Sequence, residues 1–490
     1  MVTTKSQTQT QTPSLKPLPA PLKLQPYRWT TQPIDYLEAA AKQYGDLFTI
    51  QTPYYKEPIV VISHPQAMQE VFTAPSDYFD VGYTNAVLEP YLGKHSLLLL
   101  DGESHQTHRK LLMPPLHGEQ MRSYGGIICD TTLRISREWK AKHPLVVYPF
   151  MQEVSSRVIL QVVFGLEANQ HEELQQLILS FLNTATSPLG AALMFFMQLR
   201  RDFGPWSPWG RIVRQRQRME ALLITEIEQR RQCDDSRNDV LSLLLTAQDE
   251  AGQSLTNQEI CDELLTLLFA GNDTLTTSLS WGFYWIHRDP DVLEKLLAEL
   301  VTLGENPDPI AISRLPYLSA VCSEILRFYP PSFVTSRRIV KKPIALMGYQ
   351  LEPGMQIFPC IYLTHHRPEI YPDPKQFKPE RFLEQQFSPY EFLPFGGGNR
   401  RCIGHAFAQF EMKLVIATML SHYSLKLTSN RPLKPQRRGF LVPPAGGVRM
   451  NITERKLQTG DRSTESTTTA STAQTTSGCP FKRYFAAKGQ

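Results

Sequence analysis

The chain has 490 residues, of which 41% are hydrophobic and 20% are charged. These are ordinary values for a globular protein with a large core, so they exclude a chain that is disordered along most of its length. Fifty-one basic residues against 47 acidic ones leave a net charge of +4. That excess is too small to indicate nucleic acid or an anionic membrane as the main partner. Any basic patch must therefore be local.

Seven cysteines are scattered along the chain without any C-x-x-C pair. This pattern argues against a disulfide framework or a zinc ribbon and favours a reducing compartment, so we expect a cytoplasmic protein. The N-terminal segment is rich in Thr, Gln, Pro and Lys. It contains no apolar run that could serve as a signal peptide or a membrane span, so we expect no membrane anchor.

The expected elements begin with a helix over 34–43 and strands over 47–52 and 58–62. From 67 to 423 apolar residues recur at three- and four-residue spacing, and prolines fall mainly at segment ends, which indicates helices. The sequence thus predicts a mainly α protein with one or two small sheets. Further short strands are expected over 338–345, 356–362, 424–427 and 439–442.

The domain organisation follows from composition at the two ends. After residue 455 the chain becomes rich in Thr and Ser, and it has too little apolar surface to offset the entropy of ordering. We found no internal repeat. We predict a flexible arm over 1–30, one folded domain over 31–455 and a disordered tail over 456–490.

A long helix is expected in the middle of the chain. Thr256 followed by Glu259 has the spacing of a capping box, and helical periodicity then runs to Arg288, before Asp289-Pro290 begins another helix. About 32 residues at ~1.5 Å each span roughly 48 Å, enough to cross a globular protein of this size. The helix should therefore be buried for much of its length.

The middle of this helix reads Ala270-Gly271-Asn272-Asp273-Thr274. Gly, Asp and Thr are poor choices there unless a special geometry is needed. The small Ala270 and Gly271 would let a flat group approach, and Asp273 with Thr274 would supply a carboxylate and a hydroxyl for proton delivery beside it. The alternative is a structural helix bend in which the Thr hydroxyl bonds to the preceding turn.

Two charged patterns flank the later part of the chain. Glu324 and Arg327, at i and i+3 on one helical face, precede a double proline, and Arg381 follows some fifty residues later in Pro-Glu-Arg-Phe. Earlier, His105 and Arg109 lie at i and i+4 and so share a helical face. Either pair would ordinarily mark a solvated surface.

A glycine-rich loop near the C-terminus delivers a cysteine to the start of an apolar helix. Residues 395–404 read FGGGNRRCIG. The positive end of the following helix, together with Arg400 and Arg401, favours a thiolate at Cys402, so we predict an ionised sulfur that ligates a metal. The three glycines would let a flat partner such as haem lie against the backbone. The alternative is a buried structural cysteine.

The pattern Phe395-x-x-Gly398-x-Arg400-x-Cys402-x-Gly404 resembles the haem-binding loop of the cytochrome P450 superfamily. The resemblance implies a single large fold of that type with a long central helix, haem b as cofactor and Cys402 as the axial ligand of its iron. It also implies a soluble, bacterial-type monooxygenase. The 270–274 segment resembles the oxygen-activation motif of the same superfamily, with one departure, Leu275 in its last position.

The same resemblance assigns roles to the charged pairs. Glu324, Arg327 and Arg381 would form a buried triad that fixes the loop behind the haem. His105 and Arg109 resemble the clamp that holds a haem propionate, and Arg400 would be a further partner. Arg338 resembles the second propionate arginine, although a one-residue slip in a strand would put Arg337 there instead.

The expected reaction is insertion of one oxygen atom of O2 into a C–H bond of a hydrophobic molecule such as a fatty acid or terpenoid. No G-x-G-x-x-G follows a predicted strand, so a separate ferredoxin- or flavodoxin-type protein should deliver electrons to what we expect to be a monomer. The alternatives are a haem-thiolate isomerase or peroxygenase, and a silent haem sensor. Candidate pocket residues are Thr266, Leu267, Phe333, Val334, Phe440 and Leu441; candidate docking cations are Lys110, Arg400, Arg401 and Lys413.

Overall fold

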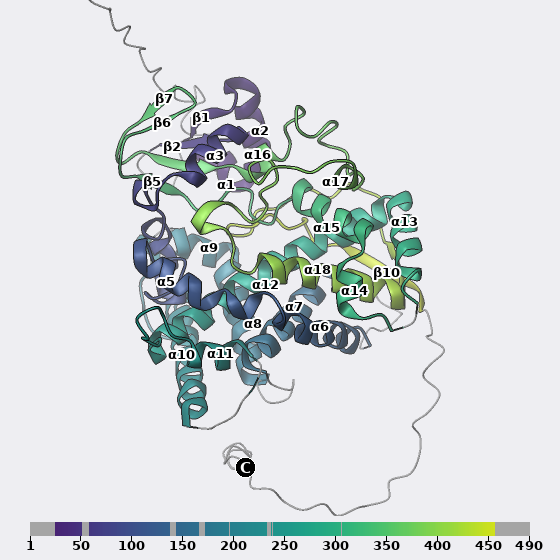
Figure 1. The fold of residues 1–490 in the computed structure, drawn as a ribbon, viewed down its shortest axis with the longest axis horizontal. Coiled ribbons are helices and arrows are strands. Elements are labelled where there is room, and N and C mark those ends of the chain that lie inside the picture. Colours follow the sequence, from purple (N-terminus) through teal and green to yellow (C-terminus); the bar gives the residue numbers. More distant parts are fainter. Residues whose placement is uncertain are drawn as a thin grey trace, which may run out of the picture.

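A computed structural model describes residues 25–50, 58–137, 144–165, 172–195, 197–232, 237, 239–304 and 306–455. Helices make up most of it (Figure 1). In that view the strands β1, β2 and β5 gather with helices α1, α2 and α3 at the upper left, while the long helix α12 lies in the middle of the helical part. The predicted mainly α fold with small sheets is confirmed.

The elements follow one another along three stretches of chain. The first holds α1 Gln25–Thr31, α2 Pro33–Tyr44, β1 Leu47–Ile50, β2 Ile59–Ile62, α3 Pro65–Thr73, η1 Ser76–Tyr78, β3 Phe79–Asp80, η2 Tyr83–Leu88 and α4 Glu89–Leu92. The second holds α5 Gly102–Leu112, η3 Pro114–Leu116, α6 Gln120–Ser136, β4 Leu145–Val146, α7 Val147–Phe164, α8 Glu172–Thr186, α9 Pro188–Phe195, η4 Met197–Leu199, α10 Pro208–Gln232, α11 Val240–Thr246, α12 Asn257–Arg288, α13 Pro290–Val301, α14 Pro309–Ser313 and α15 Pro316–Phe328. The third holds β5 Arg338–Val340, β6 Ile344–Leu346, β7 Tyr349–Leu351, β8 Gln356–Pro359, α16 Ile361–Thr364, α17 Arg381–Glu384, η5 Gly398–Arg400, α18 His405–His422, β9 Tyr423–Leu427 and β10 Arg449–Arg455.

The largest sheet has the strand order β1-β2-β8-β5-β3. Its β2 and β8 pair in parallel with Ile59 opposite Gln356, and the other neighbours are antiparallel. This parallel pair joins the N-terminal strands to a segment almost three hundred residues later, so the sheet packs the beginning of the chain against its later part. A three-stranded sheet β4-β10-β9 and the hairpin β6-β7 complete the β structure of the described residues.

Three sequence-based boundaries differ from the structure. The predicted arm reaches residue 30, and its residues 1–24 lie outside the described part. Residues 25–31 form α1, because Trp29 is buried and its ring packs against Phe333 and Phe358. The expected strand over 439–442 is wrong: Leu441 and Arg438 exchange backbone hydrogen bonds of 2.9 and 3.0 Å in a tight turn. The expected strand over 338–345 is two strands, β5 and β6.

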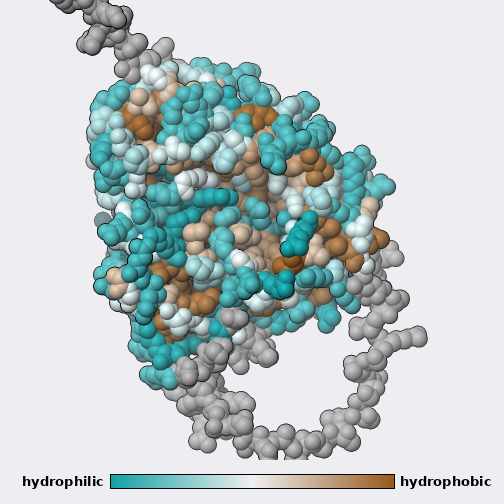
Figure 2. All heavy atoms as spheres, viewed as in Figure 1, coloured by the Kyte–Doolittle hydropathy of each residue, from teal (hydrophilic) through white to brown (hydrophobic). Residues whose placement is uncertain are grey.

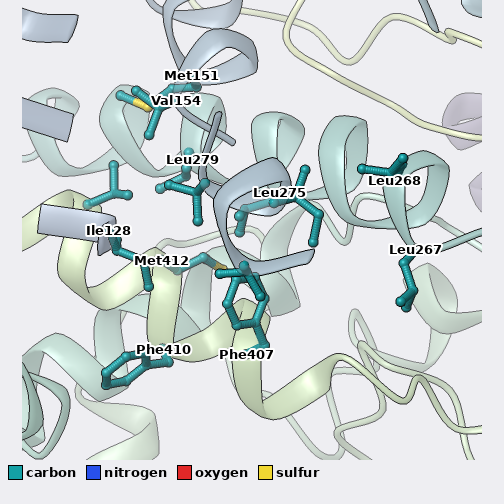
Figure 3. Packing of buried hydrophobic residues seen from close by; sticks show 14 of the residues in the cluster. Ile128, Met151, Val154, Leu267, Leu268, Leu275, Leu279, Phe407, Phe410 and Met412 are labelled. Carbon is teal, nitrogen blue, oxygen red and sulfur yellow. The ribbon is translucent and has the colours of Figure 1, made fainter. Parts of the chain in front are cut away.

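The predicted long helix is confirmed as α12 with the expected capping box, in which the side chains of Thr256 and Glu259 each bond to the other's backbone. Buried residues of α12, α7, α6 and α18 share one hydrophobic core. In Figure 3, Phe407 and Met412 of α18 lie below α12 at Leu275, and Met151 and Val154 of α7 lie above it. The start of α18, and with it the cysteine loop, is thus held against the middle of α12.

The outer surface is mostly hydrophilic or neutral on the face shown in Figure 2, with hydrophobic residues in separate patches. Apolar residues instead fill the interior in three clusters, the largest around α12. Among the residues that the structure describes, no helix combines the length and apolar character needed to cross a bilayer. The predicted tail over 456–490 lies outside the described residues.

Candidate functional site

The cysteine loop is shaped by contacts with α3. Gly396 and Gly398 have φ values of +69° and +63°, which favour glycine. A Cβ at Gly397 would lie 2.6 Å from the ring of Phe72, and one at Gly398 would lie 2.4 Å from the Phe72 carbonyl oxygen. For Gly397 and Gly398 the explanation that the glycines make room for a flat partner is therefore wrong. Their missing side chains let the loop pack on α3.

The loop leaves Cys402 accessible just before α18. Its N–H donates to the carbonyl of Phe395 at 3.0 Å, which fixes the cysteine against the start of the loop. No other atom lies within 4 Å of a Cβ built at Gly404. The backbone here is therefore open on the side of the cysteine, as a ligand of a bulky metal cofactor requires.

Opposing effects act on the Cys402 thiol. Loss of water around the sulfur raises the pKa of Cys402, and the Gly404 N–H, Arg109 and Arg401 act in the opposite direction. The helix end and the arginines thus act on the thiol in the predicted direction, against the effect of burial. A bound metal cation would supply the missing stabilisation of the thiolate.

The middle of α12 borders open space on one face. Between Ile260 and Tyr284 only residues 269, 270, 271 and 274 are not buried. Ala270 and Thr274, at i and i+4, share a face, whereas a Cβ at Gly271 would point at Ile159 of α7, 3.3 Å away. Ala270 thus leaves room on the open side, and Gly271 serves the contact between α12 and α7.

The acid and the alcohol of α12 point in different directions. Asp273 is buried, and its Oδ1 accepts a hydrogen bond of 3.0 Å from Nε2 of Gln152 on α7. The Thr274 hydroxyl is partly accessible and donates to the Ala270 carbonyl at 2.8 Å. This hydrogen bond is the one expected if Thr274 served only to bend the helix, yet α12 stays helical throughout. The hydroxyl keeps its second role as an acceptor toward the open side.

Three basic side chains line one cavity together with Gly397 of the cysteine loop and residues of α3. They are His105 of α5, Arg338 of β5 and Arg400 of the cysteine loop. Burial and the neighbouring Arg400 and Arg109 lower the pKa of His105 to about 3, and burial and Arg400 lower the pKa of Arg338 to about 9. The two pKa shifts have the same causes. The side chains are buried, and the positive charges at this site outnumber the negative ones.

Arg338 shows that imbalance most clearly. It is buried, its Nη1 donates to Thr335 Oγ1 at 2.9 Å and to the Ser336 carbonyl at 3.0 Å, and no acidic side chain of the described chain forms an ion pair with it. Arg400 has one acidic partner, Asp101. Arg109 instead donates to the Arg401 carbonyl at 2.6 Å, and Arg337 bonds to Gln356.

The residues present fit haem. An unpaired buried arginine needs an anionic partner, and the two propionates of haem are anions. His105, Arg338 and Arg400 would bind them, while Cys402 would hold the iron. In the structure the cavity is lined by Arg338, and Arg337 faces the sheet.

Replacement of Arg338 tests this assignment. Arg338→Leu should release haem to an excess of apomyoglobin at least about tenfold faster, because a charge-assisted bond is worth ~1.5–3 kcal/mol. The matched control is Arg337→Leu, which removes the neighbouring arginine and should change the rate much less. Equal release rates from the two variants would contradict the assignment.

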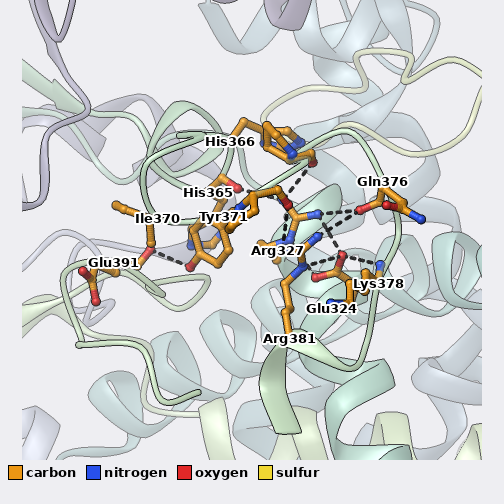
Figure 4. A network of polar contacts seen from close by, with 12 residues as sticks. Glu324, Arg327, His365, His366, Ile370, Tyr371, Gln376, Lys378, Arg381 and Glu391 are labelled. Carbon is orange, nitrogen blue, oxygen red and sulfur yellow. Dashed lines mark hydrogen bonds and ion pairs between the residues drawn. The ribbon is translucent and has the colours of Figure 1, made fainter. Parts of the chain in front are cut away.

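Glu324, Arg327 and Arg381 meet in the interior (Figure 4). Arg327 donates to both carboxylate oxygens of Glu324 at 2.7 and 2.8 Å, and Arg381 Nε donates to Oε1 at 3.2 Å. The two guanidinium groups also donate to carbonyls of the segment between β8 and α17, namely His365, Pro372, Pro374 and Gln376. The triad therefore holds that segment, which precedes the cysteine loop.

His365 links the triad to the loop. Its backbone carbonyl accepts from Arg327, and its Nε2 accepts the N–H of Leu393 at 3.0 Å. The ring can accept there only while Nε2 carries no proton. Burial and Arg327 lower the pKa of His365 to about 3.

This shift gives a pH dependence. An unfolded histidine titrates near pH ~6.5, so below that pH the unfolded chain binds a proton that folded His365 excludes, and stability falls as pH drops from ~6.5 toward 3. His365→Gln should lower the slope of unfolding free energy against pH by at most about 1.4 kcal/mol per pH unit. Denaturant unfolding at several pH values measures it. An unchanged slope would show that His365 is protonated in the folded protein.

Sequence reasoning missed the side chains that hold the 93–98 loop on α12. Asp262 Oδ2 accepts from His95 N and Glu263 Oε2 from Leu97 N, both at 3.1 Å. Glu263 Oε1 lies 2.7 Å from Nδ1 of His108 on α5. The sequence signal that could have revealed these contacts is the pair of adjacent acidic residues, Asp262 and Glu263, in an otherwise apolar helix. Through Leu97 and the next residues this loop also supplies the carbonyls that Arg400 binds.

The predicted pocket residues do not form one lining. Thr266 is buried and donates to Ser96 Oγ at 2.7 Å, Leu267 packs in the main core and Phe333 packs on Trp29. Val334 and Leu441 are partly or barely accessible, and Phe440 is exposed. The structure thus places Arg400 of the cysteine loop at the cationic cavity and packs the start of α18 against α12, and it leaves most of these apolar side chains in the core.

Comparisons with known proteins identify the family of this chain. The model of the family "Cytochrome P450" matches residues 12–448. Mycobacterium tuberculosis cytochrome P450 135B1 is 32% identical over 464 residues, 91% of each chain, and cytochrome P450 138 of that organism is 32% identical over 417 residues, 84% of this chain and 90% of its own. The solved structure "Retinoic acid bound cyanobacterial CYP120A1" has a TM-score of 0.76 at 25% identity, covering 88% of this chain and 96% of that one. With a family match across most of its length and Cys402 in the matched region, this chain belongs to the cytochrome P450 family and is a haem-dependent monooxygenase.

Proposed function

We propose that this monooxygenase uses haem b to hydroxylate a hydrophobic molecule such as a fatty acid or a terpenoid. The observation that carries the proposal is the open face of α12, where Ala270 and Thr274 interrupt an otherwise buried helix. The relative whose structure is titled as bound to retinoic acid supports a hydrophobic substrate class.

Haem held by a thiolate supplies the oxidising power, because the electron density of sulfur favours O–O cleavage. The protein supplies position and protons. Cys402 holds the iron, and His105, Arg338 and Arg400 bind the propionates. These residues would hold the cofactor, and the small side chain of Ala270 on the open face of α12 would leave space for substrate and dioxygen.

Proton supply comes from Thr274 and Asp273. The Thr274 hydroxyl can turn from the Ala270 carbonyl and donate into the open space. Asp273 is held by Gln152, whose Nε2 also lies 3.3 Å from Oδ1 of the exposed Asn183. Gln152 thus holds the buried carboxyl and links it by a hydrogen bond to an exposed side chain, so Asp273 is the acidic group nearest in sequence to the Thr274 hydroxyl on the open face.

Electrons come from a separate ferredoxin- or flavodoxin-type protein. Three of the four candidate docking cations are already engaged: Lys110 pairs with Glu250, Lys413 donates to the Ser313 carbonyl, and Arg400 turns inward to Asp101. The fourth, Arg401, is exposed. Arg401, beside Cys402 and next to Arg109 of α5, is therefore the best placed to meet an acidic donor.

The test has two stages. The haem-loaded protein is titrated with a library of fatty acids and terpenoids, and binders that shift the iron spin state are offered with a surrogate ferredoxin, its reductase and O2, or with peroxide alone. Product that requires both O2 and reductant is expected. Turnover with peroxide only would make the protein a peroxygenase, rearrangement without oxygen would make it an isomerase, and no product despite reduction would make it a sensor.

A further inference from the structure

The buried acid of α12 stands at the inner end of a row of polar side chains that leads to the surface. Asp273 is 4% exposed, and Gln152 of α7 is 7% exposed. Asn183 of α8 is exposed, and beside it lies Arg438, which begins the tight turn that ends at Leu441. Each side chain is hydrogen-bonded to the next, so two amides connect the arginine to the acid. Asp273, Gln152, Asn183 and Arg438 are called the amide row below.

The hydrogen bonds of the amide row fix which end of each amide faces which neighbour. Arg438 Nη2 donates to Asn183 Oδ1 at 3.1 Å. The same oxygen accepts from Gln152 Nε2 at 3.3 Å, and that nitrogen also donates to Asp273 Oδ1 at 3.0 Å. Gln152 Nε2 carries two hydrogens, so it can serve both acceptors at once. The Gln152 amide therefore presents a donor, and not its oxygen, to the carboxyl of Asp273.

Arg438 sets this orientation because a guanidinium group has donors only. Asn183 must turn its oxygen toward Arg438, and that oxygen can face Gln152 only through the Gln152 NH2 group. A half-turn of both amides would exchange oxygen and nitrogen at each position. The Gln152 oxygen would then face Asp273 and could accept only from a carboxyl that keeps its proton. The two orientations therefore favour opposite protonation states of the acid.

The guanidinium of Arg438 is itself held in place. Its central carbon lies 5.1 Å from the ring centre of Tyr148, which stands one helical turn before Gln152 on α7. Burial and the neighbouring Asp273 raise the pKa of Tyr148, whereas Arg438 and Thr277 act in the opposite direction. The phenol of Tyr148 thus lies beside the acid, and the cation of Arg438 reaches it through the two amides.

We propose that Arg438 is a positioning residue for the reaction, because through Asn183 it holds the Gln152 amide with its NH2 group toward Asp273. An N–H that donates to a carboxylate favours the charged form. Asp273 then gives its proton more readily to the oxygen of Thr274, while the hydroxyl passes its own proton into the open space. This consequence for turnover rests on the proton-delivery role of Asp273 in the proposed function, whereas the orientation of the amides does not.

Two substitutions test the amide row in the haem-loaded protein, measured as its reduced carbonyl complex. Arg438→Leu removes the cation, and Asn183→Leu removes the oxygen between the cation and Gln152 while the cation stays. In each variant Asp273 should hold its proton about tenfold more tightly, because the donor is no longer kept toward the carboxylate. Carbon-13 NMR of protein labelled at the aspartate carboxyl carbons follows the titration, and Asp273→Asn assigns the signal.

The matched control is Arg437→Leu, which removes the adjacent arginine, whose Nη1 donates to the Trp29 carbonyl at 2.8 Å. Asp273 should titrate in this variant as in the unmodified protein, and all variants should keep their haem content. A tighter proton in Arg438→Leu but not in Asn183→Leu would mean that the charge acts directly through space. That result, or an unchanged titration in both variants, would overturn the proposal.

Turnover distinguishes this proposal from the proposed function. In Arg438→Leu and Asn183→Leu the pH dependence of product formed per electron should move upward by about one pH unit, which corresponds to the same tenfold change in proton affinity. A changed Asp273 titration together with an unchanged pH dependence of product would support the amide orientation and would remove the proton-delivery role of Asp273.

Discussion

Arg327→Ala is expected to yield protein that does not retain haem. The substitution leaves the carboxylate of Glu324, fully buried, with Arg381 as its remaining cation at 3.2 Å. Breaking a buried ion pair by removing one partner costs about 3–5 kcal/mol. It also removes the donors to the carbonyls of His365 and Pro374. The segment leading to the cysteine loop then loses its fixed path.

The measurement is haem per chain after purification, with circular dichroism to show that helices persist. Lys295→Ala is the matched control, because Lys295 forms an exposed ion pair with Glu380, next to Arg381. Exposed pairs contribute little to stability, so this variant should contain as much haem as the unmodified protein. A normal haem content in Arg327→Ala would remove the role of the triad.

Asp273→Asn and Thr274→Ala are expected to lower product formation by about 10²-fold or more while haem binding stays normal, since a positioned proton donor contributes roughly 10²–10⁴-fold. Neither side chain lies among the residues of the cationic cavity. Electrons should still be consumed, and they should appear as peroxide or water in place of product. Product and reductant are therefore measured in the same reaction.

Thr276→Ala provides the control for Thr274→Ala. Thr276, two residues further along α12, makes the same kind of hydrogen bond, from its hydroxyl to the carbonyl of Asn272 at 2.9 Å, but it is buried. A loss of helix stability alone would affect both threonine variants alike. Unchanged product per electron in Asp273→Asn and Thr274→Ala would contradict the proton-delivery role.

Local patterns in the sequence predict the local parts of this protein well. The capping box at Thr256 and the periodicity up to Arg288 define α12, because cap and helix depend on residues within a few positions of each other. Glu324 and Arg327 can be paired from their spacing alone. Arg381 joins them only through the fold, so its place rested on the family resemblance, and the structure then shows the contact.

The failures share a physical cause, which is contact between distant segments. Gly397 and Gly398 are required by Phe72, more than three hundred residues earlier. The end of the expected arm is helical because the Trp29 ring packs against Phe333 and Phe358. Asp262 and Glu263 satisfy backbone groups of another loop. The apolar pocket was also misjudged, since periodicity shows that Leu267 faces inward but not whether core or cavity lies there.

The central claim is that Cys402 is the axial ligand of haem iron. Its most direct test is the absorption spectrum of the reduced carbonyl complex of the purified protein and of Cys402→Ser. The unmodified protein should show the strongly red-shifted Soret band that thiolate ligation produces, and the Cys402→Ser variant should lack it. Retention of that band in Cys402→Ser would mean that another residue ligates the iron, and would contradict the account.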